Sequence, residues 1–339
     1  MQKPANQLIP EDSANTAQAS DSIVVVCAAD DQYAMPLAVT IRSAIENLKG
    51  ERKISLFIID GGIKERNKRR ILESWDAEKC TVSWIPSPDH LFGEIEVNRQ
   101  PTYGDVPVAI LSIATYYRIL IPELLPKDLK KAIYLDSDLA VVGDLGELWD
   151  IDVKDNYLLA AQEFLTPYVS SPLGLVNYRE LGFSEDSKYF TPGVLVFNLE
   201  KCRADDLCAR CIKYLHTHRE FIRWHDSDVL NAVIAGEWGQ LHPKWNQMSY
   251  IYDCSSWKDT GYSEEVFNEA LNHPLIVHFA KPSKPWNSRE KHPLQHLFFH
   301  YLDMTAWSGW RLTIWRRLQR RLIREIKQFK NLVVQKKAV

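Results

Sequence analysis

Two carboxylates separated by one residue follow a short apolar run in the segment Tyr134-Leu135-Asp136-Ser137-Asp138. In open parallel sheets, ligands bind beyond the carboxyl ends of the strands, so acidic side chains at such an end are well placed for chemistry. Hard divalent cations such as Mg²⁺ and Mn²⁺ prefer oxygen ligands and keep coordination positions open for phosphate oxygens. The segment therefore predicts a metal-assisted phosphate site, with an ordinary turn or cap as the alternative.

Other phosphate-handling or cation-binding motifs fit this segment poorly. An EF-hand loop needs a glycine at its sixth position, where Val141 stands. A phosphatase with an aspartyl nucleophile stays open only as an analogy, because such enzymes normally carry the motif near the start of their domain. Neither a P-loop nor a glycine-rich dinucleotide fingerprint occurs in the sequence.

A second candidate segment runs from His278 to Trp286 with the sequence HFAKPSKPW. Imidazole is a ligand for Mn²⁺ as well as for softer metals. Lys284, six residues after the histidine, can meet a diphosphate as a point charge, and the prolines stiffen the loop between them. A strand-end histidine followed by surface lysines is the alternative interpretation.

The first apolar run of the chain ends in the segment AADDQY, residues 28–33. Acidic and amide side chains there can hydrogen-bond a base or a ribose, and Tyr33 can stack on the base. Aspartate is also common at helix starts, so Asp30 or Asp31 can instead cap a helix. The residues alone leave both roles open.

Short β-branched runs alternate with longer segments of helical spacing, which is typical of a parallel sheet with helices on its faces. The expected fold class is therefore α/β. We expect strands at 22–28, 53–59, 81–85, 131–135, 194–197 and 275–279, and helices at 36–49, 64–75, 109–121, 205–217 and 227–235.

Composition indicates a globular chain, since 45% of the 339 residues are hydrophobic. The net charge of -3 conceals an asymmetry, because residues 307–337 carry ten Arg or Lys and one Glu. Residues 1–21 lack the apolar core of a secretory signal and are expected to form a short disordered tail. No run of about 18 apolar residues occurs, so no membrane span is predicted.

Beyond Trp307 the sequence predicts a basic amphipathic helix. Its apolar residues recur at helical spacing, while arginines and lysines fill the remaining positions. Helices of this kind lie in the interface of anionic membranes, with tryptophans as anchors. The alternative is a helix packed on the rest of the protein with a solvated basic face. Nucleic acid is not expected as a partner.

Five segments occur in the order AADDQY, YLDSD, TPGVLVFNL, HDSDVLN and HFAKPSKPW. In this order and at these separations they resemble glycosyltransferase family 8, which includes bacterial lipopolysaccharide galactosyl- and glucosyltransferases and glycogenin. The resemblance covers residues 22–286. It implies a GT-A fold, that is, a nucleotide-diphospho-sugar transferase fold with a Rossmann-like mixed sheet flanked by helices. It also implies Mn²⁺ (or Mg²⁺) dependence, a UDP-sugar donor and retention of anomeric configuration.

The resemblance also assigns residues to roles. The implied metal ligands are Asp136, Asp138 and His278. The implied donor-binding residues are Asp30, Gln32, Tyr33, Ser137, Lys281 and Lys284. The implied catalytic or donor-sugar residues are Asp226, Ser227 and Arg118. For Asp226 and Asp228 a helix N-terminus is the alternative, because its dipole favours acidic side chains.

Three positions depart from the family pattern. Thr191-Pro192 stands where many relatives have Asn before a small residue, Lys281 where relatives often have Gly, and Ser227 where many have Gln. These positions bear on acceptor contacts, on charge near the diphosphate and on donor preference, respectively.

The expected organisation is a tail at 1–21, a GT-A catalytic domain at 22–290 and a helical, basic, membrane-associating segment at 291–339. The expected activity is a retaining, metal-dependent transfer of glucose or galactose from a UDP-sugar to a saccharide or glycolipid acceptor, such as lipopolysaccharide or another surface glycan. Same-face attack is the expected route, with Asp226 as the alternative nucleophile, since Ser227 is a poor nucleophile without a base. A non-catalytic nucleotide-sugar binder and a self-glucosylating primer remain alternatives. The expected location is cytoplasmic, peripheral on the inner face of the cell membrane.

Overall fold

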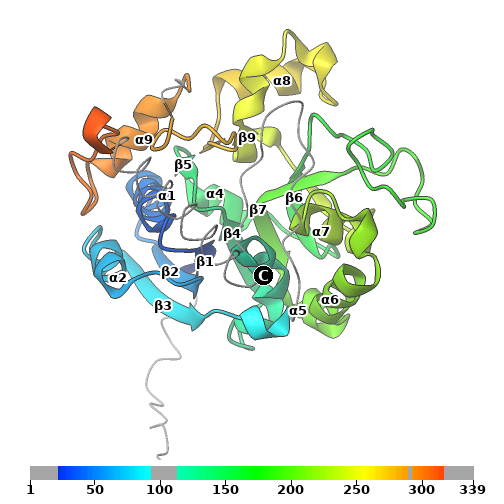
Figure 1. The fold of residues 1–339 in the computed structure, drawn as a ribbon, viewed down its shortest axis with the longest axis horizontal. Coiled ribbons are helices and arrows are strands. Elements are labelled where there is room, and N and C mark those ends of the chain that lie inside the picture. Colours follow the sequence, from blue (N-terminus) through cyan, green and yellow to red (C-terminus); the bar gives the residue numbers. More distant parts are fainter. Residues whose placement is uncertain (1–21, 93–112, 289–291, 317–339) are drawn as a thin grey trace, which may run out of the picture.

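The computed structural model of the protein describes residues 22–92, 113–288 and 292–316 (Figure 1). The predicted tail at 1–21 and most of the predicted basic helix, 317–339, lie outside the described residues. Among the described residues, no helix combines the length and apolar character needed to cross a membrane.

The central element is a seven-stranded mixed sheet with the strand order β3-β2-β1-β4-β7-β6-β8. Its strands are β1 Ser22–Ala29, β2 Lys53–Asp60, β3 Cys80–Pro86, β4 Lys131–Leu135, β6 Leu158–Gln162, β7 Phe190–Asn198 and β8 Gly239–Leu241. Neighbouring strands are parallel except at β7, which runs antiparallel to β4 and β6. The parallel half from β3 to β4 therefore brings its carboxyl ends to one edge, where ligands bind in such sheets.

A smaller sheet has the order β5-β10-β9, with β5 Leu139–Val141, β9 Gln247–Met248 and β10 Ile276–His278. The α-helices are α1 Ala34–Asn47, α2 Glu65–Leu72, α3 Ile121–Leu124, α4 Leu145–Asp150, α5 Leu199–Ala204, α6 Leu207–Thr217, α7 Asp226–Ile234, α8 Glu264–Asn272 and α9 Gln295–Leu302. The 3-10 helices are η1 Asp89–Leu91, η2 Ile113–Leu120, η3 Arg219–Phe221, η4 Pro243–Asn246, η5 Ser249–Asp253 and η6 Trp257–Asp259.

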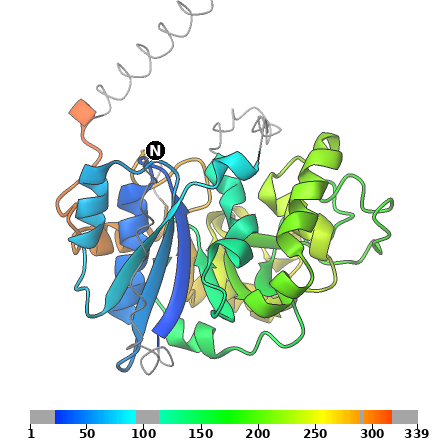
Figure 2. The same ribbon diagram turned by 90° about the horizontal axis from the view of Figure 1, so that it is seen from below.

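The large sheet is covered on both faces, and β1 shows how its sequence achieves this. Successive side chains of a strand point to opposite faces. Val25 and Cys27 pack into a core shared with α1, α9 and the small sheet, whereas Val24 and Val26 pack into a core shared with α3, α5, α6 and α7. In Figure 1, α1 and α2 accordingly lie on one side of the strands and α6 and α7 on the other. Figure 2 shows the blue first strands and helices at one end of the molecule, with the orange segment beside them, and the green elements at the other end.

The four strands predicted before residue 136 are confirmed to within one residue at each end. The described part of the helix predicted at 109–121 is instead the 3-10 helix η2 followed by α3. Five successive residues, 116–120, are buried in η2, so the segment lacks the exposed face of an amphipathic helix.

The helix predicted from Trp307 begins later, with residues 314–316 helical. Trp307 is only 5% exposed, and the Arg70 guanidinium lies 4.2 Å from the centroid of its ring. Arg70 also donates to the Ala306 carbonyl at 2.7 Å. The first residues assigned to the basic helix therefore belong to the core beside α2.

Candidate functional site

The carboxylates of Asp136 and Asp138 lie where the two sheets meet. Asp136 follows the last residue of β4, and Asp138 precedes the first residue of β5. Antiparallel pairing of β5 with β10 sets His278 opposite Leu139, and the Phe279 amide donates to the Asp138 carbonyl at 3.0 Å. Strand pairing thus brings the distant histidine to the acidic pair.

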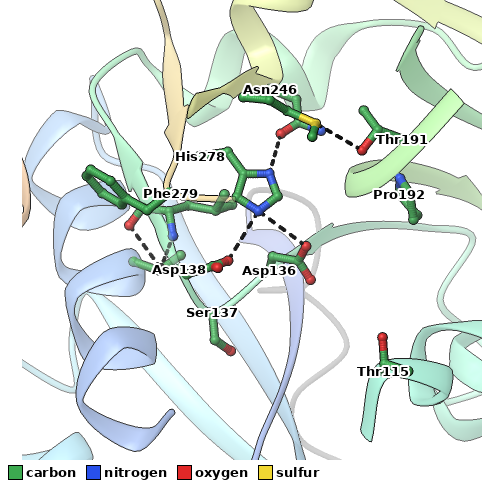
Figure 3. Close-up of polar contacts among 12 residues, drawn as sticks. Thr115, Asp136, Ser137, Asp138, Thr191, Pro192, Asn246, His278 and Phe279 are labelled. Carbon is green, nitrogen blue, oxygen red and sulfur yellow. Dashed lines mark hydrogen bonds and ion pairs between the residues drawn. The ribbon is translucent and has the colours of Figure 1, made fainter. Parts of the chain in front are cut away.

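The imidazole of His278 faces both carboxylates through one nitrogen. Its Nε2 is 3.3 Å from Asp138 Oδ1 and 3.6 Å from Asp136 Oδ2 (Figure 3). Its Nδ1 is 2.9 Å from Asn246 Oδ1, and because an amide oxygen only accepts, Nδ1 donates there while Nε2 faces the carboxylates. One ligating atom from each of the three residues lies within 4.8 Å of the others. The geometry and the donor set fit Mn²⁺ or Mg²⁺.

Gly193 in β7 leaves the space that this imidazole occupies. A β-carbon at Gly193 would lie 2.6 Å from His278 Cε1, a separation that side chains do not tolerate. The Gly193 carbonyl also accepts from the Asp136 amide at 2.9 Å. The glycine therefore allows backbone and imidazole to approach closely while it fixes the start of the acidic turn.

Lys284 neutralises the second carboxylate. Its ammonium lies 2.6 Å from Asp138 Oδ2 and 2.6 Å from the Phe279 carbonyl oxygen. Burial alone would raise the pKa of Asp138, but the positive charges of Lys284 and His278 outweigh burial and hold that pKa well below its usual range. Asp138 is consequently ionised and able to act as a cation ligand.

Arg118 in η2 joins the acidic pair to an acidic residue of α7. Its Nη2 lies 2.9 Å from Asp136 Oδ1, and its Nε lies 3.0 Å from Asp226 Oδ2. Its Nη1 donates to the Pro192 carbonyl at 2.7 Å. Because the guanidinium is planar and rigid, it fixes the spacing of β4, β7 and α7 around the site.

The two acidic residues at the start of α7 have different roles. Burial raises the pKa of Asp226 to about 6, although Arg118 and the Thr115 hydroxyl, which donates at 2.8 Å, oppose the rise. Asp228 instead accepts from the Tyr189 hydroxyl at 2.8 Å and from two backbone amides of the turn before α7 at 2.6 and 2.7 Å. Asp228 therefore organises the helix start, whereas Asp226 faces the site.

These groups open into a cleft of about 940 Å³, a volume in the range of small-molecule sites. The predicted site residues that line it are Tyr33, Arg118, Asp136, Asp226, Ser227, His278, Lys281 and Lys284. Other lining residues are Leu165, Thr166, Leu173, Trp224, Met248 and Tyr250. The cleft thus has an ionic part and a wall of apolar and aromatic side chains.

The remaining predicted donor contacts have local partners. Asp30 Oδ1 accepts from the amides of Gln32 and Tyr33 at 2.8 and 3.1 Å, within the turn before α1, whose N-cap position is Tyr33 and not Asp30 or Asp31. The Ser137 hydroxyl donates to the Ala28 carbonyl at 2.8 Å, and Figure 3 shows it pointing away from the imidazole. None of Asp30, Gln32 and Ser137 is among the residues that line the cleft, whereas the Tyr33 ring does line it.

Two further titratable side chains line the cleft and were missed from the sequence. Glu163 directly follows β6, and burial raises its pKa to about 7. His225, just before Asp226, has φ of 52°, and burial lowers its pKa to about 4. The apolar run Leu158–Gln162 was the available signal for a strand ending at Glu163. No local signal distinguished His225.

Lys281 differs in orientation from the other lysine of its loop. Its ammonium lies 2.6 Å from Asp253 Oδ1 and 5.6 Å from the centroid of the Tyr250 ring. Both partners belong to η5. Lys281 therefore points along the cleft wall, while Lys284 points to Asp138.

Sequence comparison relates the chain to carbohydrate-active proteins. A model of glycosyl transferase family 8 matches residues 24–290. The chain is 33% identical over 288 residues to General stress protein A of Bacillus subtilis, covering 84% of this chain and 94% of that protein. It is 26% identical over 200 residues to lipopolysaccharide 1,3-galactosyltransferase of Salmonella typhimurium, covering 58% of this chain and 56% of that protein.

Structure comparison confirms the predicted fold. The crystal structure of the galactosyltransferase LgtC in complex with donor and acceptor sugar analogs matches with a TM-score of 0.68 and 24% identity, covering 87% of this chain and 99% of that one. The described residues therefore form a GT-A fold, with the large mixed sheet between layers of helices.

Proposed function

This chain belongs to glycosyltransferase family 8, and from that premise we propose that it transfers a hexose, glucose or galactose, from a UDP-sugar to a saccharide acceptor with retention of configuration. The observation that carries the proposal is the meeting of Asp136, Asp138 and His278, whose ligand atoms lie within 4.8 Å of one another, where Asp136 and His278 line the cleft. The lipopolysaccharide galactosyltransferase among the relatives supports an acceptor on a surface glycan.

The three side chains would hold Mn²⁺ or Mg²⁺, which when bound would neutralise the diphosphate of the donor. Lys284 adds a fixed positive charge next to Asp138, where that diphosphate would lie. Tyr33, whose ring meets Trp286 edge-on at 6.0 Å between centroids, would contact the uracil end of the donor. We assign Asp30, Gln32 and Ser137 only weaker donor contacts, because none of them lines the cleft and the side chains of Asp30 and Ser137 are engaged by the backbone.

The residues around the donor sugar favour same-face attack. Asp226 is held by Arg118 and Thr115, and this pairing limits its freedom to form a covalent bond with the sugar. Ser227 needs a base to act as a nucleophile. We therefore assign Arg118 and Asp226 to orienting the sugar hydroxyls, while the leaving phosphate accepts the proton of the incoming acceptor hydroxyl. The planar guanidinium of Arg118, which contacts both Asp136 and Asp226, holds these side chains in fixed positions during the reaction.

A donor-hydrolysis screen tests the proposal. Purified protein is incubated with a panel of UDP-hexoses, with and without Mn²⁺, and UDP release is measured. We expect release for UDP-glucose or UDP-galactose only with a divalent cation, and loss of release in Asp138→Asn but not in Asp186→Asn, a change of an exposed carboxylate. Cation-independent release, or wild-type release by Asp138→Asn in excess Mn²⁺, would contradict it. Absence of release from every donor would favour a non-catalytic binder, and a mass increase of the protein itself would favour a self-glucosylating primer.

We further propose that the C-terminal segment attaches the enzyme to the inner face of an anionic membrane. Ile314 and Trp315 are 64% and 78% exposed, which is unusual for side chains of this size. Arg311 and Arg316 lie close to them in the chain, and eight more basic residues follow within residues 317–337. Exposed tryptophan beside clustered cations suits the interface of an anionic bilayer. A lipid-linked acceptor would make this location useful.

A further inference from the structure

The two lysines of the loop after β10 serve different parts of the cleft. The Lys284 ammonium is 2.6 Å from Asp138, at the candidate cation site. The Lys281 ammonium is 2.6 Å from Asp253 and rests near the ring of Tyr250, both in η5. The charge of Lys281 is thus directed away from the place where the donor diphosphate would meet the cation.

Lys281 also differs from the other cationic side chains of the cleft in how its charge is balanced. Among the described residues, Arg118 is engaged by Asp136 and Asp226, whose side chains are 19% and 7% exposed, and Lys284 by Asp138, which is 10% exposed. The side chains of Arg118 and Lys284 are themselves 8% and 10% exposed. The counter-ion of Lys281 is Asp253, whose side chain is 57% exposed and which does not line the cleft. An ion pair with a well-exposed partner contributes little stability, so a substrate anion can replace Asp253 at low cost.

If the donor binds as proposed, Lys281 lies in the part of the cleft that the donor would leave to the acceptor. The proposed donor would occupy the charged part of the cleft. This part lies between Tyr33, the acidic pair Asp136 and Asp138, and the ion pair of Arg118 with Asp226. The wall left over contains Met248 and Tyr250, and Lys281 lies on it. A sugar ring can stack on this wall, and a substituent attached to the ring can then reach the ammonium of Lys281.

We propose that Lys281 binds a negatively charged group of the acceptor, a phosphate or a carboxylate, and thereby selects anionic saccharides over neutral ones. The proposal rests on the transferase function proposed above. On binding, the anion takes the place of Asp253 as the partner of the ammonium. Because the ammonium and the anion are both ionised, their hydrogen bond is charge-assisted and stronger than a neutral one.

Matched sugars that are neutral or anionic at carbon 6 test this inference. Galactose, galacturonate and galactose 6-phosphate, together with glucose and glucose 6-phosphate, are offered with UDP-hexose and Mn²⁺ to four proteins. These are the wild type, Lys281→Met, Asp253→Asn and a control, Lys258→Met, which removes a lysine of η6 that does not line the cleft. Transfer is measured as kcat/KM for each sugar, and inhibition of UDP-hexose hydrolysis by each sugar is measured in parallel, so that a sugar that binds without reacting is still detected.

We expect the wild type and Lys258→Met to prefer the anionic sugars of each set over the neutral one in transfer or in inhibition. Lys281→Met should lose about tenfold to hundredfold of this preference, as expected for a hydrogen bond to a charged group, with the loss in KM or Ki of the anionic sugars. Asp253→Asn should bind the anionic sugars more tightly, because the competing carboxylate is gone.

Two results would overturn the inference. One is the absence of any charge preference in the wild type in both assays. The other is a rise in KM for UDP-hexose in Lys281→Met with neutral and anionic sugars affected equally, which would place Lys281 at the donor diphosphate instead. Failure of the transferase function itself is recognised separately, because wild-type UDP release would then be absent with every donor.

Discussion

Gly193 and His278 approach so closely that any side chain at position 193 would collide with the imidazole. The distance from an ideal β-carbon to His278 Cε1 is 2.6 Å, and to Nδ1 it is 2.7 Å. Position 193 lies in β7 and position 278 in β10, so the contact joins the large sheet to the small one. The imidazole is thereby held in the orientation that presents Nε2 to Asp136 and Asp138.

Gly193→Ala is therefore expected to displace His278 and weaken the cation site. We expect Mn²⁺ affinity, measured by isothermal titration calorimetry in the presence of UDP, to fall by about tenfold or more, as when a group that orients a metal ligand is lost. UDP-hexose hydrolysis should fall with it. Circular dichroism should report an intact fold, and unchanged Mn²⁺ affinity in a folded variant would show that the close approach is not needed.

Arg118→Lys keeps a positive charge but cannot reach Asp136, Asp226 and the Pro192 carbonyl together. We expect kcat for transfer to fall by about a hundredfold or more in Arg118→Lys and in Arg118→Gln, a magnitude typical of losing a preorganised polar group. Equal damage from both changes would show that geometry matters more than charge. A kcat near that of the wild type in Arg118→Lys would show that a guanidinium contacting all three groups is not required.

Part of the fold and of the candidate site could be predicted from the sequence, because some of the patterns that determine them are local. The strand ending at Leu135 and the acidic pair after it form one contiguous pattern, and both were predicted. The pairing of β5 with β10 depends on three residues in each strand, too few for any periodicity, so its contribution to the site was invisible. His278 was a candidate ligand from its place after an apolar strand, but its pairing with Asp136 and Asp138 came only from the family resemblance.

Other features required the folded chain. Asp226 and Asp228 have different roles because only Asp226 faces Arg118. The order of residues in the sequence does not reveal which side chain does so. The role of Glu163 also required the folded chain, because the run before it indicates a buried strand but does not show that the next side chain lines a cleft. Trp307 was misjudged because its helical spacing with later residues suggested a continuous helix, whereas it packs against Arg70 of α2.

Glu163→Gln tests the burial of a carboxyl group beside the cleft. Burial raises the pKa of Glu163 from 4.5 to about 7, so the folded state holds its proton more tightly than the unfolded state. The wild type should therefore lose stability as pH rises from 4.5 to about 7. Urea unfolding should give similar free energies for both proteins near pH 4.5 and a free energy higher by roughly 1–3 kcal/mol for Glu163→Gln at pH 8. A constant difference across pH would contradict the raised pKa.

The membrane proposal is tested in the full-length chain. Ile314→Ser and Trp315→Ser should together weaken sedimentation with phosphatidylserine-containing vesicles by about tenfold or more, because large apolar side chains would no longer enter the interface. Leu72→Ser, a change of an exposed leucine of α2, is the matched control and should bind as the wild type does. Equal binding by the double variant would contradict a role for these two side chains.

The most direct measurement is the crystal structure of the protein soaked with Mn²⁺ and UDP, with data collected at the manganese absorption edge. A single anomalous peak is expected in contact with Asp136, Asp138 and His278 Nε2 at about 2–2.3 Å, bridged to both phosphates of UDP. The Lys284 ammonium should contact the diphosphate, and Lys281 should not. A peak elsewhere, or a diphosphate bound without these three side chains around its cation, would contradict the account.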